Sequence, residues 1–581
     1  MFLSENLFKK EWHVSFLTKL QNTLAGFGLA EKIVFAILFI TFAVSALFLI
    51  KRATEVFLVE IPASGGGLTE GVVGSVGMIN PLLAISDADR DLTAVIYSGL
   101  LKATSDGALI GDLAKDWVVS EDGLQYTFTL KNALFFHNGA PVTADDVLFT
   151  IQKAQDPSLK SPKRANWEGV AVEKMGSNQI RFTLKQPYSS FLENATLGIL
   201  PKHLWKDIDS EQFSFSQYNV APVGSGPFEV AAVKKNSGGL PVAYELKSFK
   251  KYALGRPLLN KLTFRFFNSE EALLAAFNKG EVESMSAIAP ATAKTLKTRN
   301  IRVEQTPLPR VFALFFNQNQ APIFANLEVR KALALTVNRS EIVDEVLGGY
   351  GTKIIGPLPP GVLTETPTLD NPMATDSAAL AESLLTKNGW KKNSEGIFEK
   401  KSKKETLTLA FTITTSSAPE LKKTAEILKA NWAKIGANVS VMVFDPGELN
   451  QTIIRPRKYD ALLFGEIIGR DPDLFAFWHS SQRNDPGLNI ALYANIKADK
   501  LLEEARTIAA QNERLQKYAA FSEEIKKDLP AIFLYSPDFM YVLPEKIKGF
   551  VFGRLTTPSD RFTGIHRWYT ETDKVWKIFS F

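Results

Sequence analysis

Between residues 124 and 155, the spacing of apolar side chains changes from the period of a strand to the period of a helix. Tyr126, Phe128 and Leu130 alternate with polar residues, which is the pattern of a strand with one buried face. Further along, apolar residues recur at the spacing that places them on one face of an otherwise polar helix. We therefore predict a half-buried strand and then an amphipathic helix.

The junction between these two elements carries turn and capping residues. Asn138-Gly139 tolerates the positive φ angles of a tight turn. Thr143 can cap a helix, and Asp146 stands three residues later, where the acid of a capping box belongs. Pro157 is incompatible with a continuing helix. The helix is thus predicted to begin after Thr143 and to end before Pro157.

The longest uncharged apolar run of the chain covers residues 33–50. As a helix it would rise about 27 Å, enough to cross the hydrocarbon core of a bilayer. A cleavable signal peptide has a shorter apolar core nearer the terminus and a small-residue cleavage site. We therefore predict an uncleaved signal anchor, with a cleaved signal or a buried core helix as alternatives. Four lysines precede the run and only Lys51 and Arg52 follow it before Arg90, which places the N-terminus in the cytoplasm and the large domain outside.

Strand and helix patterns alternate between residues 407 and 468. The predicted order is strand 407–414, helix 420–435, strand 438–444, short helix 448–454 and strand 461–468. This order indicates parallel strands with right-handed crossovers. Ligands bind beyond the carboxyl ends of such strands. Those ends are residues 415–417, 445–447 and 469–473.

Composition narrows the classes of function. Of 581 residues, 45% are apolar, enough for two or three globular domains. The net charge of +5 comes from 67 basic and 62 acidic residues that are interleaved, so no nucleic-acid partner is predicted. The absence of cysteine excludes disulfides, thiolate metal sites and cysteine nucleophiles.

Catalytic and metal-binding patterns are missing from the sequence. The five histidines form no H-x-x-x-H pair, and no G-x-S-x-G or Walker sequence occurs. Asp471-Pro472-Asp473 could be a carboxylate pair, but we favour a helix start with Asp471 as its cap. Asp87, Asp89 and Asp91 resemble half of a calcium loop that lacks its glycine and its final glutamate, so a helix start is favoured there too. We predict no catalytic residue, no metal and no cofactor.

Residues 117–147 resemble the core signature of the family 5 extracellular solute-binding proteins, the peptide-binding receptors of ABC importers. The signature runs from W-x-x-S-x-D-G through Y-x-F-x-L to F-H-N-G-x-P-x-T-A-x-D-V. The matching residues are Trp117, Ser120, Asp122, Gly123, Tyr126, Phe128, Leu130, Phe136, His137, Asn138, Gly139, Pro141, Thr143, Ala144, Asp146 and Val147.

The resemblance implies an α/β, periplasmic-binding-protein-like fold: two α/β lobes joined by a two-strand hinge, with an extra subdomain on the first lobe. One N-terminal transmembrane helix is added to it. The expected parts are a cytoplasmic segment 1–32, the anchor 33–50, a tether 51–67, lobe I at 68–104, 206–311 and 531–581, its subdomain 105–205, and lobe II at 312–530.

The resemblance also implies a function. The chain would be a monomer that captures peptides between its lobes, outside the cell, and delivers them to an ABC permease and its ATPase subunits. One alternative is that the same fold binds another solute, such as an oligosaccharide. A second alternative is a sensory or structural ectodomain without transport, and an anchored peptidase is the third and weakest.

Candidate ligand-binding residues follow from the expected cleft. Oligopeptide-binding relatives bind the peptide ammonium with an aspartate at the place that Ile468 holds here, so nearby acids are candidates to replace it. Specificity is expected near residues 466–478. The candidates are Trp167, Phe312, Asn317, Glu466, Asp471, Asp473, Trp478 and Tyr535.

Overall fold

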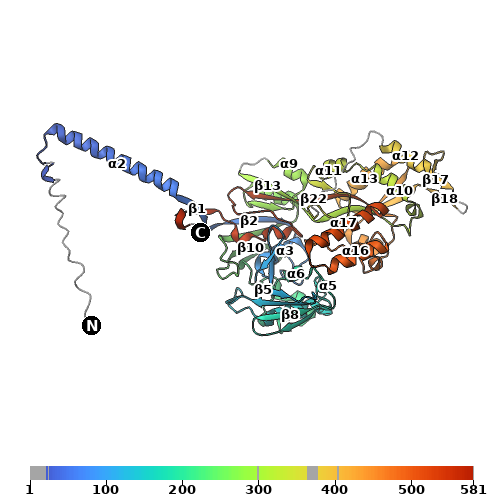
Figure 1. Ribbon diagram of the computed structural model, residues 1–581, viewed down its shortest axis with the longest axis horizontal. Coiled ribbons are helices and arrows are strands. Elements are labelled where there is room, and N and C mark those ends of the chain that lie inside the picture. Colours follow the sequence, from blue (N-terminus) through green and yellow to red (C-terminus); the bar gives the residue numbers. More distant parts are fainter. Residues whose placement is uncertain (1–20, 24, 297–299, 363–376, 402–404, 580–581) are drawn as a thin grey trace. The chain divides into compact units, whose positions relative to one another are not determined.

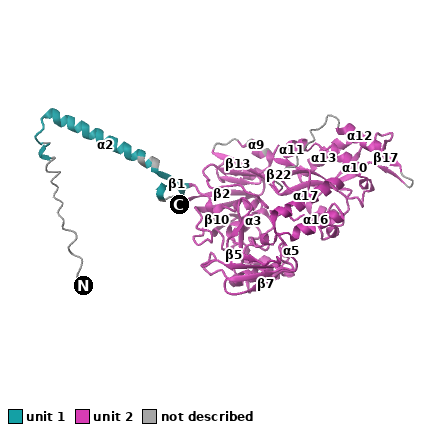
Figure 2. Cartoon of the chain, in the orientation of Figure 1, with its two compact units in different colours: residues 1–63, 571–581 teal, residues 64–570 magenta. Residues whose placement is uncertain are grey.

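The computed structural model describes residues 21–23, 25–296, 300–362, 377–401 and 405–579. Contacts divide the chain into two compact units (Figure 2): Met1–Ala63 with Glu571–Phe581, and Ser64–Thr570. Most of the predicted cytoplasmic segment lies outside the described residues.

The first unit contains helix α2 (Leu29–Phe57) and one strand pair. Leu29–Arg52 has a mean hydropathy of 2.9 and is long and apolar enough to cross a membrane. Within the predicted tether, strand β1 (Leu58–Ala63) pairs antiparallel with β23 (Glu571–Trp576). The ring of Phe57 stacks 6.4 Å from that of Trp576. Residues 571–576 of the predicted lobe I thus pair with the chain just after the apolar helix.

In the second unit, twelve strands of the described residues form one mixed sheet (Figure 1). The main order is β20-β19-β21-β14-β22-β12-β2-β11-β10-β9, and β13 and β15 also pair with β22. The strands are β2 (Gly65–Val73), β9 (Phe228–Lys235), β10 (Pro241–Ser248), β11 (Leu259–Phe267), β12 (Ser284–Ser286), β13 (Ile301–Pro307), β14 (Arg310–Phe316), β15 (Gly351–Lys353), β19 (Ala410–Ser416), β20 (Asn438–Phe444), β21 (Ala461–Ile467) and β22 (Ala531–Pro544).

Strand β22 belongs to both halves of this sheet. Its beginning pairs with β14 at Phe312↔Tyr535, and its end pairs with β12 at Met285↔Val542. The apolar clusters change at the same places: Leu308 belongs to a cluster of one half and Val311 to a cluster of the other. We call residues 64–308 and 539–570 lobe I, and residues 311–535 lobe II. The domain limits expected from the sequence remain predictions.

Lobe II contains the predicted parallel strands. Strand β19 pairs in parallel with β20 and with β21, as expected. Residues 327–346 form two helices, because Asn338 caps the second one by accepting a hydrogen bond from the Glu341 N–H (3.1 Å). The helices are α10 (Leu327–Leu335), α11 (Arg339–Val346), α12 (Ser377–Lys387), α13 (Pro419–Ala433), α14 (Pro446–Glu448) followed by a π-helical turn (Leu449–Ile454), α15 (Phe475–Trp478), α16 (Ile496–Thr507) and α17 (Gln511–Asp528).

A small separate sheet of lobe II consists of β16 (Lys391–Lys392), β17 (Phe398–Lys401) and β18 (Thr406–Thr408). In lobe I, α3 (Asp87–Ile96), α8 (Glu270–Asn278) and α9 (Pro290–Thr295) accompany the sheet.

The subdomain of lobe I confirms the strand and the capped helix expected from residues 124–155. Tyr126, Phe128 and Leu130 are buried on one face of β6. The Thr143 N–H donates to the Asp146 carboxylate over 2.8 Å at the start of α4. The subdomain elements are β3 (Leu101–Ala103), β4 (Leu109–Gly111), β5 (Ala114–Val119), β6 (Gln125–Leu130), α4 (Ala144–Gln155), α5 (Arg164–Trp167), β7 (Ala171–Lys174), β8 (Gln179–Thr183), α6 (Phe191–Asn194) and α7 (Lys202–Trp205).

A fully buried ionic cluster fixes α3 and the C-terminal part of lobe I to the sheet. The Arg561 guanidinium lies 2.5 Å from an Asp91 oxygen and 3.0 Å from a Glu70 oxygen. The Tyr541 hydroxyl donates to the other Glu70 oxygen over 2.7 Å. Burial raises the pKa of both carboxyls, and the charge of Arg561 opposes that rise. The acids that resembled a calcium loop therefore open α3, and Asp91 binds an arginine.

We predict that Arg561→Leu lowers the free energy of unfolding by about 3–5 kcal/mol, because it leaves Glu70 and Asp91 buried without their cation. The exposed Arg567 is the matched control, and Arg567→Leu should change stability by less than about 0.5 kcal/mol. Urea unfolding of the full chain in detergent, followed by tryptophan fluorescence, measures both. Equal stability of the two variants would show that the cluster does not support the fold.

Candidate functional site

A cavity of about 400 Å³ lies between the two lobes. We call it the hinge cavity. Lobe II contributes the start of α13, just beyond the carboxyl end of β19, where parallel strands are expected to place ligands. Lobe I contributes the start of α3 and the segment before α9. Its charged and aromatic lining residues are Asp87, Glu270, Arg310, Phe312, Tyr350, Glu420, Tyr535, Asp538 and Phe539.

Two residues predicted from the sequence meet in the wall of the hinge cavity. The rings of Phe312 and Tyr535 stack at 5.0 Å with an interplanar angle of 18°. They sit opposite each other on β14 and β22. A side chain at Gly465, on the neighbouring strand, would begin 2.7 Å from the Phe312 ring, so glycine makes room for the stack. Their part in ligand binding stays a prediction.

The hinge cavity has more acidic than basic groups. The Glu270 carboxylate accepts from the Ala289 N–H at 3.1 Å, and Asp87 pairs with Arg90 at 3.7 Å. Asp538 differs, because its Oδ1 is buried and has no hydrogen-bond partner among the described residues. Partial burial raises the pKa of its carboxyl. Burial lowers the pKa of Arg310, the cation of this lining.

A second cavity of about 410 Å³ also joins the lobes, and we call it the Arg554 cavity. Pro307 and Pro309 line it, whereas Leu308, Arg310 and Phe312 line the hinge cavity. Alternate residues of the same extended crossover thus face the two cavities. The charged residues of the Arg554 cavity are Asp106, Arg470 and Arg554.

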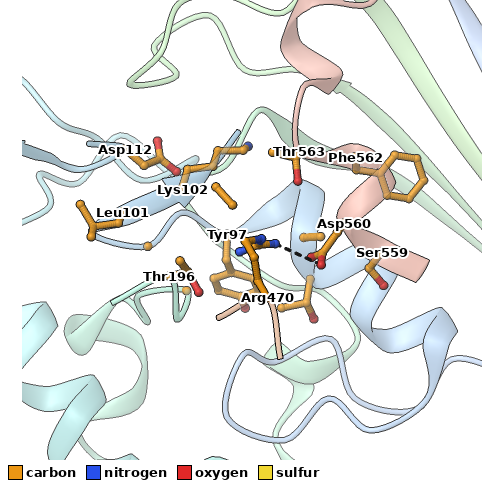
Figure 3. Close-up of a pocket in the computed structure, with 15 residues that line it drawn as sticks. Tyr97, Leu101, Lys102, Asp112, Thr196, Arg470, Ser559, Asp560, Phe562 and Thr563 are labelled. Carbon is orange, nitrogen blue, oxygen red and sulfur yellow. Dashed lines mark hydrogen bonds and ion pairs between the residues drawn. The ribbon is translucent and has the colours of Figure 1, made fainter. Parts of the chain in front are cut away.

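Polar contacts join the lobes beside the Arg554 cavity. Arg470 of lobe II is 9% exposed and lies 2.9 Å from Glu193 and 3.2 Å from Asp560, both of lobe I (Figure 3 shows the pair with Asp560). The Ser189 N–H of lobe I donates to the Arg506 carbonyl of lobe II over 2.9 Å. We call these contacts the Arg470 latch.

Comparison with known proteins decides the family. A profile described as "Bacterial extracellular solute-binding proteins, family 5 Middle" matches residues 108–487, more than half of the chain. The chain belongs to this family. It is therefore an extracytoplasmic substrate-binding protein of ABC transport and not an enzyme.

Individual relatives support the assignment. The chain is 28% identical over 516 residues to the oligopeptide-binding protein AppA of Bacillus subtilis, covering 87% of this chain and 92% of AppA. The solved structure of that AppA in complex with a nonapeptide is similar with a TM-score of 0.68 and 26% identity, covering 88% of this chain and 99% of the other. NikZ of Campylobacter jejuni in complex with Ni(L-His) is similar with a TM-score of 0.68 and 27% identity, covering 87% and 99%. These structures confirm the predicted two-lobed α/β fold.

Of the three acids that were candidates for an ammonium site, two bind arginines, and the third is buried with neither oxygen hydrogen-bonded among the described residues. Glu466 is buried within lobe II and lines neither interlobe cavity, and burial raises the pKa of its carboxyl well above the usual range. Both Asp471 oxygens accept from Arg514 at 3.0 Å. Asp473 accepts from Arg506 at 2.8 Å.

The predicted helix start at Asp471-Pro472 is wrong, because α15 begins at Phe475. Asp471 accepts from the Ser190 hydroxyl of lobe I over 2.8 Å as well as from Arg514. Its short side chain therefore joins a loop of lobe II to lobe I, and it does not cap a helix. A sequence pattern that ends at Pro472 shows neither partner.

The remaining candidates lie inside the protein. Trp478 packs against Phe315 and Phe533 at ring distances of 6.0 and 5.8 Å. Trp167 packs 5.5 Å from Phe182 in the core of the subdomain. The Asn317 side chain donates to the Arg457 carbonyl over 2.9 Å, and its oxygen accepts from backbone N–H groups of the following turn. None of these three side chains lines the hinge cavity or the Arg554 cavity.

Sequence reasoning missed Asp538, Arg310, Arg470 and Arg554. One signal was available for Asp538: it is a charged residue inside the long apolar run of residues 531–543. Burying a carboxylate there without a hydrogen bond or a cation is energetically unfavourable. The three arginines carry no comparable signal, because none interrupts an apolar run: Arg310 precedes one, and Arg470 and Arg554 each follow a glycine.

We predict that Arg470→Gln weakens the latch, because Glu193 and Asp560 lose their shared cation. The population with separated lobes should rise, and ligand affinity should fall about tenfold. Since the chain has no cysteine, one dye can be placed on an introduced cysteine of each lobe, and energy transfer then reports their separation. Arg455→Gln is the control, because Arg455 pairs with Asp485 inside lobe II. Identical transfer in both variants would exclude the latch.

Proposed function

We propose that this chain captures peptides with a free N-terminus between its lobes and delivers them to an ABC permease. The carrying observation is Asp538, whose half-buried carboxylate lines the hinge cavity and has one oxygen without a partner among the described residues. The AppA relative, which is named for oligopeptide binding and was solved with a nonapeptide, supports the same ligand class.

The electrostatics of the hinge cavity favour a cationic group. A partly buried carboxylate is stabilised when a cation replaces the water that it has lost. No charged neighbour contributes to the pKa shift of Asp538, which arises from burial. Asp87 and Glu420 add negative charge to the same lining. The N-terminal ammonium of a peptide supplies the missing cation. Asp538 then takes the role that relatives give to the aspartate at the place of Ile468.

The remaining lining suits the rest of a peptide. A volume near 400 Å³ lies within the range of ligand pockets, about 300–1,000 Å³. The stacked rings of Phe312 and Tyr535 offer an apolar wall for a side chain. Arg310, the basic group of this lining, can donate to peptide carbonyls or to a terminal carboxylate. A short extended peptide therefore finds complementary charge, apolar contact and hydrogen-bond donors there.

Membrane attachment completes the proposal. The apolar part of α2 stays in the mature protein as a signal anchor, with the N-terminus in the cytoplasm and the binding lobes outside. A receptor held in this way needs no lipid-modified cysteine, and the chain has none. The permease and its ATPase subunits are the expected partners.

We predict that Asp538→Asn weakens binding of a free tetrapeptide about tenfold or more, because it removes the charge that faces the ammonium. The N-acetylated tetrapeptide should bind the wild-type protein and the variant with equal, weaker affinity. Asp116→Asn, at an exposed position of β5, is the matched control. Calorimetry on the full chain in detergent measures all pairs. If the loss is the same for free and acetylated peptides, Asp538 does not bind the ammonium.

The same site predicts a pH dependence. The pKa of Asp538 is raised, so its charge is lost on acidification before that of an ordinary aspartate. Affinity for the free peptide should therefore fall as pH falls through this raised pKa, and the pH dependence should be weaker in Asp538→Asn.

The ligand class has its own test. If an oligosaccharide binds and no peptide does, the peptide proposal is overturned.

For the anchor, we predict that an N-terminal epitope tag remains on the mature protein in membrane fractions. A protease added to intact cells should remove the large domain and spare the tag, since the tag lies in the cytoplasm. A mature protein that has lost the tag would indicate a cleaved signal. A large domain that resists the protease until the cells are lysed would contradict the orientation.

A further inference from the structure

A third cavity, of about 170 Å³, is lined by Arg470, Lys102, Asp112 and Asp560 (Figure 3). We call it the Arg470 pocket. Lobe I supplies Thr93 of α3, Lys102 of β3, Asp112 and Asp560, and lobe II supplies Arg470. Arg470 lines both this pocket and the Arg554 cavity.

Unpaired polar atoms are concentrated in this pocket. Among the described residues that line it, Thr93 Oγ1, Asp112 Oδ1, Arg470 Nε and Ser559 Oγ are buried and have no hydrogen-bond partner. Asp112 is only 2% exposed. A buried polar group without a partner destabilises the folded state. Four such atoms around one cavity indicate an occupant that has both hydrogen-bond donors and acceptors.

The charges of the lining balance each other. Lys102 donates to the Tyr252 hydroxyl over 3.0 Å and interacts with Asp112, while Arg470 pairs with Asp560. An additional ammonium would face Lys102 and Arg470. An additional carboxylate would face Asp112 and Asp560. An uncharged dipolar group avoids both repulsions and can satisfy a donor and an acceptor together.

From this lining we infer that the Arg470 pocket binds an uncharged carboxamide or hydroxyl side chain of the peptide ligand. The inference rests on the proposed peptide function and assigns a side-chain preference to it. The pocket has room for roughly five water molecules, which matches the five non-hydrogen atoms of a glutamine side chain. The carboxamide oxygen accepts from Arg470 Nε, and its NH₂ group donates to Asp112 Oδ1 or to Thr93 Oγ1. A side chain bound in the Arg470 pocket would also contact Arg470, the residue of the latch.

The test is a peptide series with one position varied. Each alanine of a tetra-alanine peptide is replaced in turn by glutamine, methionine, glutamate or lysine. Calorimetry on the full chain then gives the affinity of each peptide. At one position, glutamine should bind about tenfold more tightly than methionine, which has a similar size and no amide. Glutamate and lysine should bind more weakly than glutamine there.

Two variants connect the preference to the pocket. Thr93→Val and Asp112→Asn should each reduce the glutamine-to-methionine ratio at that position and leave the affinity for tetra-alanine unchanged. Thr93→Val conserves shape, so it keeps the test valid if Asp112→Asn fails to fold. Thr183→Val, on β8 of the subdomain, is the control and should keep the full ratio.

The outcomes separate the two proposals. If peptides bind and no position prefers glutamine, the pocket holds water only and the inference is overturned. Equal losses for all peptides in Thr93→Val would assign a structural role to the pocket and would also overturn it. If no peptide binds the wild-type protein, the proposed function itself fails.

Discussion

The antiparallel pairing of β14 with β22 is the constraint on which the interlobe region depends. These strands carry the chain between the lobes, and their hydrogen bonds fix the lobes to a common sheet. Two strands joined in this way permit rotation of the lobes about the crossover but oppose their separation. Because successive residues of an extended chain point in opposite directions, the crossover segment 307–312 lines one cavity with Pro307 and Pro309 and the other with Arg310 and Phe312. Residues of one crossover segment therefore line both the hinge cavity and the Arg554 cavity.

Arginine has different tasks in different parts of the protein. Arg561 is completely buried and compensates two acids that hold lobe I together. Arg514 and Arg506 engage Asp471 and Asp473, so the loop after β21 has a defined position. These pairings use the acids that stood near the expected ammonium site. Asp538 then remains as the partly buried carboxylate of the hinge cavity whose pKa shift involves no neighbouring charge.

The latch and the cavities are coupled by position. Arg470 follows β21, whose carboxyl end faces the cleft, and it reaches Glu193 and Asp560 on the other lobe. The same side chain borders the Arg554 cavity and the Arg470 pocket. A ligand group that contacts Arg470 would therefore act on a residue that also joins the lobes. Ligand binding and the contact between the lobes would then both depend on Arg470, so ligand recognition would be linked to whether the lobes are in contact.

The sequence by itself determined the features that depend on neighbours in the chain. The alternation at Tyr126, Phe128 and Leu130, the capping pair Thr143 and Asp146, and the strand-helix order of residues 407–468 all follow from local spacing. The structure confirms each of them. The family signature is equally local, and the matched profile of residues 108–487 agrees with it. Phe312 and Tyr535, which were predicted as candidates from the sequence, line the hinge cavity, and their part in ligand binding stays a prediction.

Only the tertiary structure decided which polar side chains are available to contact a ligand. Glu466, Asp471 and Asp473 look equivalent along the chain, yet Glu466 is buried and the two aspartates bind arginines 33 and 43 residues away. Asn317, Trp167 and Trp478 looked like cleft residues, and the fold places them in a turn and in two cores. Whether a carboxylate can meet a ligand depends on distant partners and on burial. Those are set when segments far apart in sequence come together, and no local pattern records them.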